Sequence, residues 1–225
     1  MNSSTPTKGY KGLSMEGPIA TWYAKTTRND MQRHKGMAAK MAEKIPAGGR
    51  VLEIAPGPGY WCIELARRGN YQITGLDISK TFIEIAQKNA AEAGLKIEFR
   101  LGNASEMPFE DNSFDFTFCQ AAFKNFSQPV KAIAEMYRVL RPRGVAVIED
   151  LRRDASQAEI AREVDQMGLG GFDALFTRWA FPLMLSRRAY TIPELKAMVA
   201  KTPFGQGKIG LSGIGFELWL EKPGA

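Results

Sequence analysis

The chain has 225 residues, of which 44% are hydrophobic and 24% charged, a composition typical of one globular domain with a sizeable core. Its two cysteines, Cys62 and Cys119, have no second cysteine or histidine at metal-ligand spacing, which argues against a disulfide-built secreted fold and a metal site. The polar start and the longest apolar run, residues 179–185, argue against a signal peptide and a membrane span, so we expect a cytoplasmic protein.

The formal net charge of +6 is confined to the N-terminal end of the chain. Residues 1–50 carry nine basic and three acidic side chains, whereas residues 51–225 carry 21 of each. A nucleic-acid groove would require basic residues across the main domain. The charge pattern therefore favours a basic lid at the N-terminus over a nucleic-acid-binding surface.

In chain order, a polar leader is expected first, and an amphipathic helix over about 30–45 follows it, with apolar residues every three or four positions. Short apolar runs then alternate with helical stretches as far as residue 150. The predicted buried strands are 51–55, 72–76, 97–101, 114–119 and 145–148, and the predicted helices between them are 60–68, 80–93 and 130–140. This alternation implies right-handed crossovers and a mostly parallel sheet with helices on both faces.

Beyond residue 150 the pattern changes to a helix over 155–167, a glycine-rich break, an aromatic stretch with arginines, and a short helix after Pro193. The C-terminus predicts an antiparallel hairpin of 208–211 and 216–220. The expected fold is a Rossmann-like, doubly wound α/β sheet of seven strands. It is divided into a basic helical segment (1–47) and a main domain (48–225), with an insertion at about 155–192.

The turn after the first strand carries Gly57 and Gly59, at the edge where open α/β sheets bind ligands. Such glycines also occur for purely conformational reasons. Asp77 ends the second strand 20 residues after Gly57, where a carboxylate can accept hydrogen bonds from ribose, so an adenosine-bearing ligand is favoured. Cys62 stands where a dinucleotide fingerprint needs a third small residue, and the GK[ST] ending of a phosphate loop is absent.

Four ordered motifs carry a family resemblance: VLEIAPGPG (51–59), GLDIS (75–79), GNASEMPFEDNSFD (102–115) and MYRVLRPRG (136–144). With them the chain resembles the class I S-adenosylmethionine-dependent methyltransferases, in the small-molecule branch related to quinone-biosynthesis methyltransferases. The resemblance implies S-adenosyl-L-methionine as cofactor and S-adenosyl-L-homocysteine as product. It extends closely over about 48–150 and loosely over the flanks.

The resemblance also implies roles for individual residues. One group would hold the methionine end, one the ribose, and one the adenine. The residues for the methionine end are Glu53, Ala55, Gly57, Gly59 and Gln120. The ribose residue is Asp77, and the adenine residues are Ile78, Asn103 and Ala104. The chain departs from the family where Ala55 replaces a glycine, Asn103 an aspartate, and Lys124 with Asn125 a histidine pair. The last departure puts the usual polar contacts at the substrate mouth in doubt.

Methyl transfer from a sulfonium is an in-line displacement that alignment and exclusion of water can promote without an enzyme nucleophile. If a general base is needed, Asp150 at the end of the fifth strand is the candidate; otherwise Asp150 caps the next helix or pairs with Arg152. Lys124 is a candidate clamp for an anionic acceptor, or a plain solvated lysine.

Aromatic residues from both flanks are candidates for the acceptor pocket, with core packing as the alternative. They are accompanied by Arg178, Arg187 and Arg188, which could hold an acidic group. The substrate-binding candidates are Trp22, Tyr23, Phe123, Phe176, Trp179, Arg178 and Tyr190.

We therefore expect a methyltransferase, monomeric or homodimeric, that modifies O, N, S or C of a small apolar or aromatic metabolite. The basic N-terminus would guide an acidic or membrane-associated small molecule, and peripheral membrane contact is compatible with it. Two alternatives stay open: an RNA or protein methyltransferase, and a cofactor-binding module without turnover.

Overall fold

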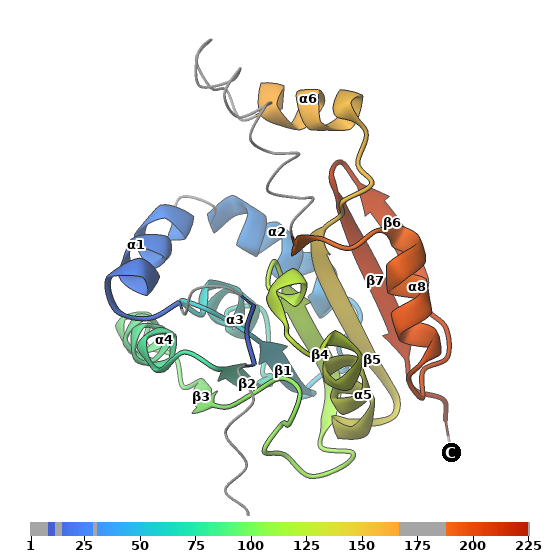
Figure 1. The fold of residues 1–225 in the computed structure, drawn as a ribbon. Coiled ribbons are helices and arrows are strands. Elements are labelled where there is room, and N and C mark those ends of the chain that lie inside the picture. Colours follow the sequence, from blue (N-terminus) through green and yellow to red (C-terminus); the bar gives the residue numbers. More distant parts are fainter. Residues whose placement is uncertain (1–8, 12–14, 29–30, 167–187, 225) are drawn as a thin grey trace, which may run out of the picture.

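The computed structural model describes residues 9–11, 15–28, 31–166 and 188–224. Its centre is one sheet of seven strands in the order β3-β2-β1-β4-β5-β7-β6, with helices on both faces (Figure 1). The first five strands run parallel and β6 and β7 form an antiparallel hairpin, so the predicted fold class is confirmed. The strands are β1 (Arg50–Ile54), β2 (Gln72–Asp77), β3 (Glu98–Leu101), β4 (Phe114–Gln120), β5 (Leu140–Leu151), β6 (Lys208–Ser212) and β7 (Gly215–Glu221).

The helices divide between two apolar layers of the core. On one face, α2, α3 and α4 cover a cluster that includes Trp61 and Phe118; on the other, α5 and α8 cover a cluster that includes Phe123 and Met136. The helices are α1 (Gly17–Thr27), α2 (Met31–Ala42), α3 (Tyr60–Ala66), α4 (Lys80–Glu92), the short 3-10 helix η2 (Phe123–Asn125), α5 (Pro129–Val139), α6 (Gln157–Gln166) and α8 (Ile192–Ala200). None of the helices in the described ranges is long and apolar enough to cross a bilayer.

Besides the short η2, which was not predicted, two elements differ from the predictions. Helix α1 lies where only a polar leader was expected, because it buries just Ala20 and Ala24 and so has no broad apolar stripe. Strand β5 is longer than the predicted 145–148 because its first part pairs through backbone groups. The N–H of Arg143 donates to the oxygen of Lys222, and the N–H of Lys222 donates to that of Gly144. Such a distant partner leaves no signal in the local apolar pattern.

The basic helix α2 is tied to the sheet by two ion pairs. Arg33 Nη2 lies 2.8 Å from Glu149 Oε1 on β5, and Lys40 Nζ lies 2.5 and 2.6 Å from the two carboxylate oxygens of Glu217 on β7. Glu149 and Glu217 are directly opposite each other in the β5–β7 register. Part of the N-terminal charge excess therefore offsets the repulsion of two facing carboxylates.

A short N-terminal strap, defined as residues 9–11 and 15–16, crosses the carboxyl edge of the sheet. The N–H of Lys11 donates to Asn125 O (2.7 Å), and the N–H of Ser127 donates to Gly9 O (3.3 Å). Further on, Ser79 Oγ donates to Met15 O at 2.7 Å. The strap thus joins the segment after β4 to the start of α4, across the edge where ligands bind in this architecture.

Candidate functional site

The turn between β1 and α3 is held in left-handed backbone conformations. Ala55, Gly57 and Gly59 have φ of 57°, 53° and 78°. A β-carbon on Gly57 would meet nothing within 4 Å, whereas one on Gly59 would lie 3.0 Å from both Ala86 Cβ and Phe99 Cζ. Gly57 therefore faces open space where a ligand can approach the main chain, and Gly59 allows α3 to pack closely.

Asp77 ends β2 beside this turn and is buried, with 5% exposure. Its Oδ2 accepts from the N–H of Gly57 (3.0 Å) and its Oδ1 from the N–H of Ser79 (2.9 Å), which leaves a lone pair on each oxygen. Burial raises the pKa of Asp77 to about 6, against the lowering effect of these hydrogen bonds. The carboxylate is fixed in place and can still accept from a ligand.

Glu53 is the second buried carboxylate of the site, on β1. Cys62 Sγ of α3 donates to Glu53 Oε2 at 2.8 Å. Burial raises the pKa of Glu53 to about 7, although the hydrogen bonds from Cys62 lower it. Within the described ranges neither Glu53 nor Asp77 is paired with a basic side chain, so two carboxyl groups at this edge are available to a ligand with cationic or hydroxyl groups.

The strap meets the residues that the resemblance assigns to adenine. A β-carbon on Gly9 would lie 2.6 Å from Ile78 Cδ1 and 2.7 Å from Asn103 Nδ2, so only glycine fits there without a shift. Asn103 Oδ1 accepts from the N–H of Ser105 at 2.9 Å, which sets the orientation of the amide, and Ala104 packs against the core beneath it. The structure thus gathers the predicted adenine residues at one place under the strap.

The ends of β4 and β5 carry a hydrogen-bonded chain toward the same edge. Gln120 Nε2 donates to Glu149 Oε2 at 2.6 Å, and Arg33 pairs with the other oxygen of Glu149. Phe118 and Val147, two residues earlier on each strand, belong to the cluster under α2 and α3, so this chain lies on the same face of the sheet as Glu53.

Asp150, the candidate base, points to the opposite face and forms a closed unit with Lys124. Lys124 Nζ lies 2.7 Å from Asp150 Oδ1, and the N–H groups of Lys124 and Leu151 donate to the same carboxylate at 2.8 Å. The side chain of Asp150 is 1% exposed and that of Lys124 18%. The two catalytic candidates are therefore partners of each other, and Arg152, the alternative partner of Asp150, pairs instead with Asp154 and Glu159.

Comparisons with known proteins bear on this site. A family model described as a methyltransferase domain matches residues 52–148. A demethylmenaquinone methyltransferase of Deinococcus radiodurans is 37% identical over 108 residues, which are 48% of this chain and 45% of that protein. The chain is similar to this methyltransferase family from β1 to β5. It spans about half the length of the curated relatives that it matches.

Solved structures share the fold of the matched region and of its flanks. One is a protein of Methanococcus maripaludis described as a candidate S-adenosyl-L-methionine-dependent methyltransferase, with a TM-score of 0.73 and 21% identity over 96% of this chain and 97% of that one. Another is a SAM-dependent methyltransferase of Aquifex aeolicus, with a TM-score of 0.61 and 18% identity over 82% and 88% of the two chains. At such identities the likeness shows the fold.

The residues predicted to form the acceptor pocket lie in different surroundings. Trp22 is 66% exposed on the outer face of α1, and Tyr23 packs edge-on against Phe82 of α4, with ring centroids 5.8 Å apart. Phe123 is fully buried and its ring centroid is 5.7 Å from that of Tyr190, so these two come together beyond β4. The remaining candidates lie outside the described residues: Phe176, Arg178 and Trp179.

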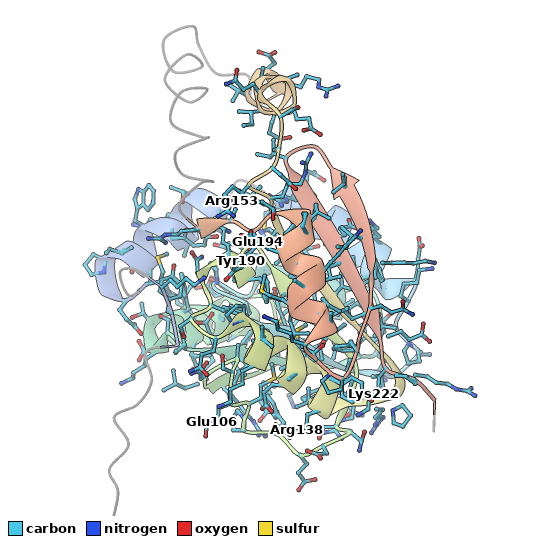
Figure 2. All side chains as sticks on the ribbon, turned by 45° about the vertical axis from the view of Figure 1, so that its right-hand side comes forward. Glu106, Arg138, Arg153, Tyr190, Glu194 and Lys222 are labelled. Carbon is cyan, nitrogen blue, oxygen red and sulfur yellow. The ribbon has the colours of Figure 1, made fainter. Side chains whose placement is uncertain are left out.

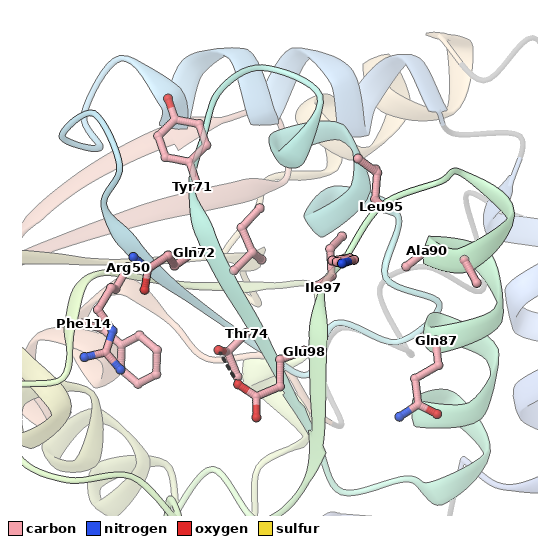
Figure 3. Close-up of a pocket in the computed structure, with 13 residues that line it drawn as sticks. Arg50, Tyr71, Gln72, Thr74, Gln87, Ala90, Leu95, Ile97, Glu98 and Phe114 are labelled. Carbon is pink, nitrogen blue, oxygen red and sulfur yellow. Dashed lines mark hydrogen bonds between the residues drawn. The ribbon is translucent and has the colours of Figure 1, made fainter.

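A groove of about 660 Å³ opens at the other edge of the sheet, where the parallel strands begin (Figure 3). It is lined by the first residues of four strands, among them Arg50, Gln72 and Glu98, and by α4. The glycine turn and both buried carboxylates follow the opposite, carboxyl ends of those strands. The groove is therefore separate from the site described above.

Sequence reasoning did not single out Tyr10 and Glu149 for this site. Tyr10 is half-buried beside Arg188 and near Asp77, and burial raises its pKa. Glu149 occupies the register position opposite Gln120, which only the β4–β5 pairing reveals. The polar leader gave no signal for Tyr10, whereas the alternation along β5 could have placed Glu149 on the Glu53 face.

Proposed function

We propose that the protein is an S-adenosylmethionine-dependent methyltransferase acting on a small aromatic acceptor of the quinol type. The observation that carries this proposal is a pair of buried carboxylates, Glu53 and Asp77, flanking a glycine turn that faces open space. The matched methyltransferase family and the demethylmenaquinone methyltransferase relatives support it from the side of the sequence.

The residues present fit this cofactor. Asp77 would accept from the ribose hydroxyls through its two remaining lone pairs, and Glu53 would accept from the methionine ammonium. Gly57 would let that end lie against the main chain, while Ile78 and Asn103 would contact adenine. When bound, the cofactor supplies an electrophilic methyl group on sulfur.

The chain contributes mainly alignment and exclusion of water. Positive charge on the sulfonium disperses during transfer, so the protein gains little from a nucleophile of its own. Asp150 already accepts hydrogen bonds from Lys124 and two backbone N–H groups, and a proton from the acceptor would compete with all three. We therefore propose positioning, and not proton abstraction by Asp150, as the leading contribution.

Calorimetric titration with S-adenosylhomocysteine tests the cofactor assignment. We expect binding by the wild type and a loss of at least tenfold in affinity for Asp77→Ala, because two hydrogen bonds to a carboxylate are removed. Asp111→Ala is the matched control, since Asp111 is 69% exposed and lies in the segment before β4. Absence of binding by the wild type would refute the proposal.

Labelled methyl transfer tests turnover separately. The protein is incubated with cofactor labelled in its methyl group and with 1,4-naphthohydroquinone, a fractionated metabolite extract, or RNA. Label in a small aromatic product is the expected result. Label only in RNA or protein would support the alternative acceptor class, and binding without any transfer would support a cofactor-binding module.

A further inference from the structure

The carboxylates near the carboxyl end of β5 are paired with cations. Glu149 pairs with Arg33 at 2.8 Å and Asp150 with Lys124 at 2.7 Å. A third pair at this end joins Arg153 to Glu194 at 2.6 Å, and Figure 2 shows it beside Tyr190. Neither Lys11 nor Arg188 takes part in these three ion pairs.

Two cations in the same region have no carboxylate partner within the described residues. Lys11 Nζ donates to the hydroxyl of Tyr190 at 2.5 Å and lies 4.7 Å from the centre of that ring. Arg188 Nη1 donates to Asn125 Oδ1 at 3.3 Å, and its guanidinium lies beside Tyr10. Both cations retain unused N–H donors, because an ammonium has three and a guanidinium five.

The fold brings these cations together from distant parts of the chain. The strap pairs with the segment after η2, which places Lys11 beside Asn125, the residue that Arg188 also contacts. The Arg152–Tyr190 bridge holds the segment of Arg188 against the end of β5. Lys11 and Arg188 thus converge beside the ring of Tyr190, which packs on the buried Phe123.

We propose that Lys11 and Arg188 bind a carboxylate of the methyl acceptor, so that the acceptor is an aromatic acid. This inference rests on the proposed function and narrows its substrate class. The aromatic ring would lie against Tyr190, with the acidic group between the two cations and the Tyr190 hydroxyl. That hydroxyl accepts from Lys11 and can donate its own proton to an anion.

The carboxylate at the methionine end of the cofactor is the alternative anionic ligand for Lys11 and Arg188. The geometry favours the acceptor, because Glu53, assigned to the methionine end, lies on the face of the sheet covered by α3. Phe123 and Tyr190 belong to the core cluster of the opposite face, under α5 and α8. In this proposal Lys11 and Arg188 bind the anionic group of the acceptor, whereas Lys124 is paired with Asp150.

A matched pair of probes tests the proposal: 1-hydroxy-2-naphthoate and 1-naphthol, which differ by one carboxylate. Each is titrated calorimetrically into the full chain saturated with S-adenosylhomocysteine. We expect the naphthoate to bind the wild type at least tenfold more tightly than the naphthol. Lys11→Met and Arg188→Met should each weaken naphthoate binding by about tenfold to a hundredfold, the usual effect of losing a charge-assisted hydrogen bond, and leave naphthol binding unchanged.

Lys25→Met is the control, because Lys25 is an exposed cation in the last turn of α1. Equal affinity of the wild type for the two probes, no binding of the naphthoate, or equal weakening of both probes in the variants would overturn the proposal. A loss of S-adenosylhomocysteine affinity in the variants would assign the cations to the cofactor and overturn it too. Failure of the wild type to bind S-adenosylhomocysteine would instead refute the proposed function.

Discussion

The substitution Glu53→Gln distinguishes the effect of the buried charge on folding stability from its effect on cofactor binding. In the free protein burial raises the pKa of Glu53 from 4.5 to about 7, so above pH 7 the folded state carries an ionised group that is more stable in the unfolded chain. A difference of about 2.5 pKa units corresponds to about 3 kcal/mol. Glutamine keeps an oxygen for the Cys62 hydrogen bond and removes the charge. We expect the variant to be about 2–3 kcal/mol more stable at pH 8.

The sign of the pH dependence makes this prediction specific. A carboxyl with a raised folded pKa binds its proton more tightly in the folded state, so its contribution to stability falls as pH rises from about 4.5 to about 7. The gain of Glu53→Gln should therefore be close to zero at pH 4.5 and reach its full size at pH 8. Urea unfolding of both proteins across this range measures it.

Binding should move in the opposite direction. The variant loses a charge-assisted hydrogen bond to the cofactor ammonium, so we expect S-adenosylhomocysteine to bind about tenfold to a hundredfold more weakly at pH 8. Glu84→Gln, on the exposed side of α4, is the control and should change neither quantity. A stability gain of the same size at pH 4.5 and pH 8, or a loss at both, would refute the reasoning about burial.

Three further predictions follow from local geometry. Ala55→Gly should raise the free energy of unfolding by up to about 1 kcal/mol in urea, because φ of 57° strains alanine; a loss of stability would contradict this. Gly57→Ala should cost about 1–2 kcal/mol and weaken S-adenosylhomocysteine binding in calorimetry, since its β-carbon enters the open space; unchanged affinity would place the ligand elsewhere. Lys40→Met should destabilise the fold by about 1 kcal/mol. In a double-mutant cycle, the same change should cost much less in a Glu217→Gln background, because the ion pair is already lost there.

The repeating part of the fold was predictable because β1, β2 and β4 are short apolar runs that are mostly buried, and the edge strand β3 follows a clear helix. That burial is a local property of the sequence, and the predicted and observed strands differ by a residue or so at their ends. Helix α1 was missed because two alanines make too narrow a stripe to stand out. The first part of β5 was missed because its pairing with Lys222 joins residues far apart in the sequence.

The site also has a part that was predictable from local sequence and a part that depends on contacts between distant residues. Glu53, Gly57 and Asp77 belong to contiguous motifs at strand ends, and the structure places them together at the carboxyl edge. The partnership of Lys124 with Asp150 joins residues 26 positions apart on neighbouring elements, so the sequence suggested only the nearby Arg152 as a partner of Asp150. The sequence shows which residues are charged, but only the fold shows which of them are in contact.

The strap closes the site with main chain, and this has a kinetic consequence. Gly9 rests directly on Ile78 and Asn103, so a ligand that uses those residues reaches them only when the hydrogen bonds from Lys11 to Asn125 and from Ser127 to Gly9 open. If an adenosine group binds under the strap, its binding and its release both require these two backbone hydrogen bonds to open.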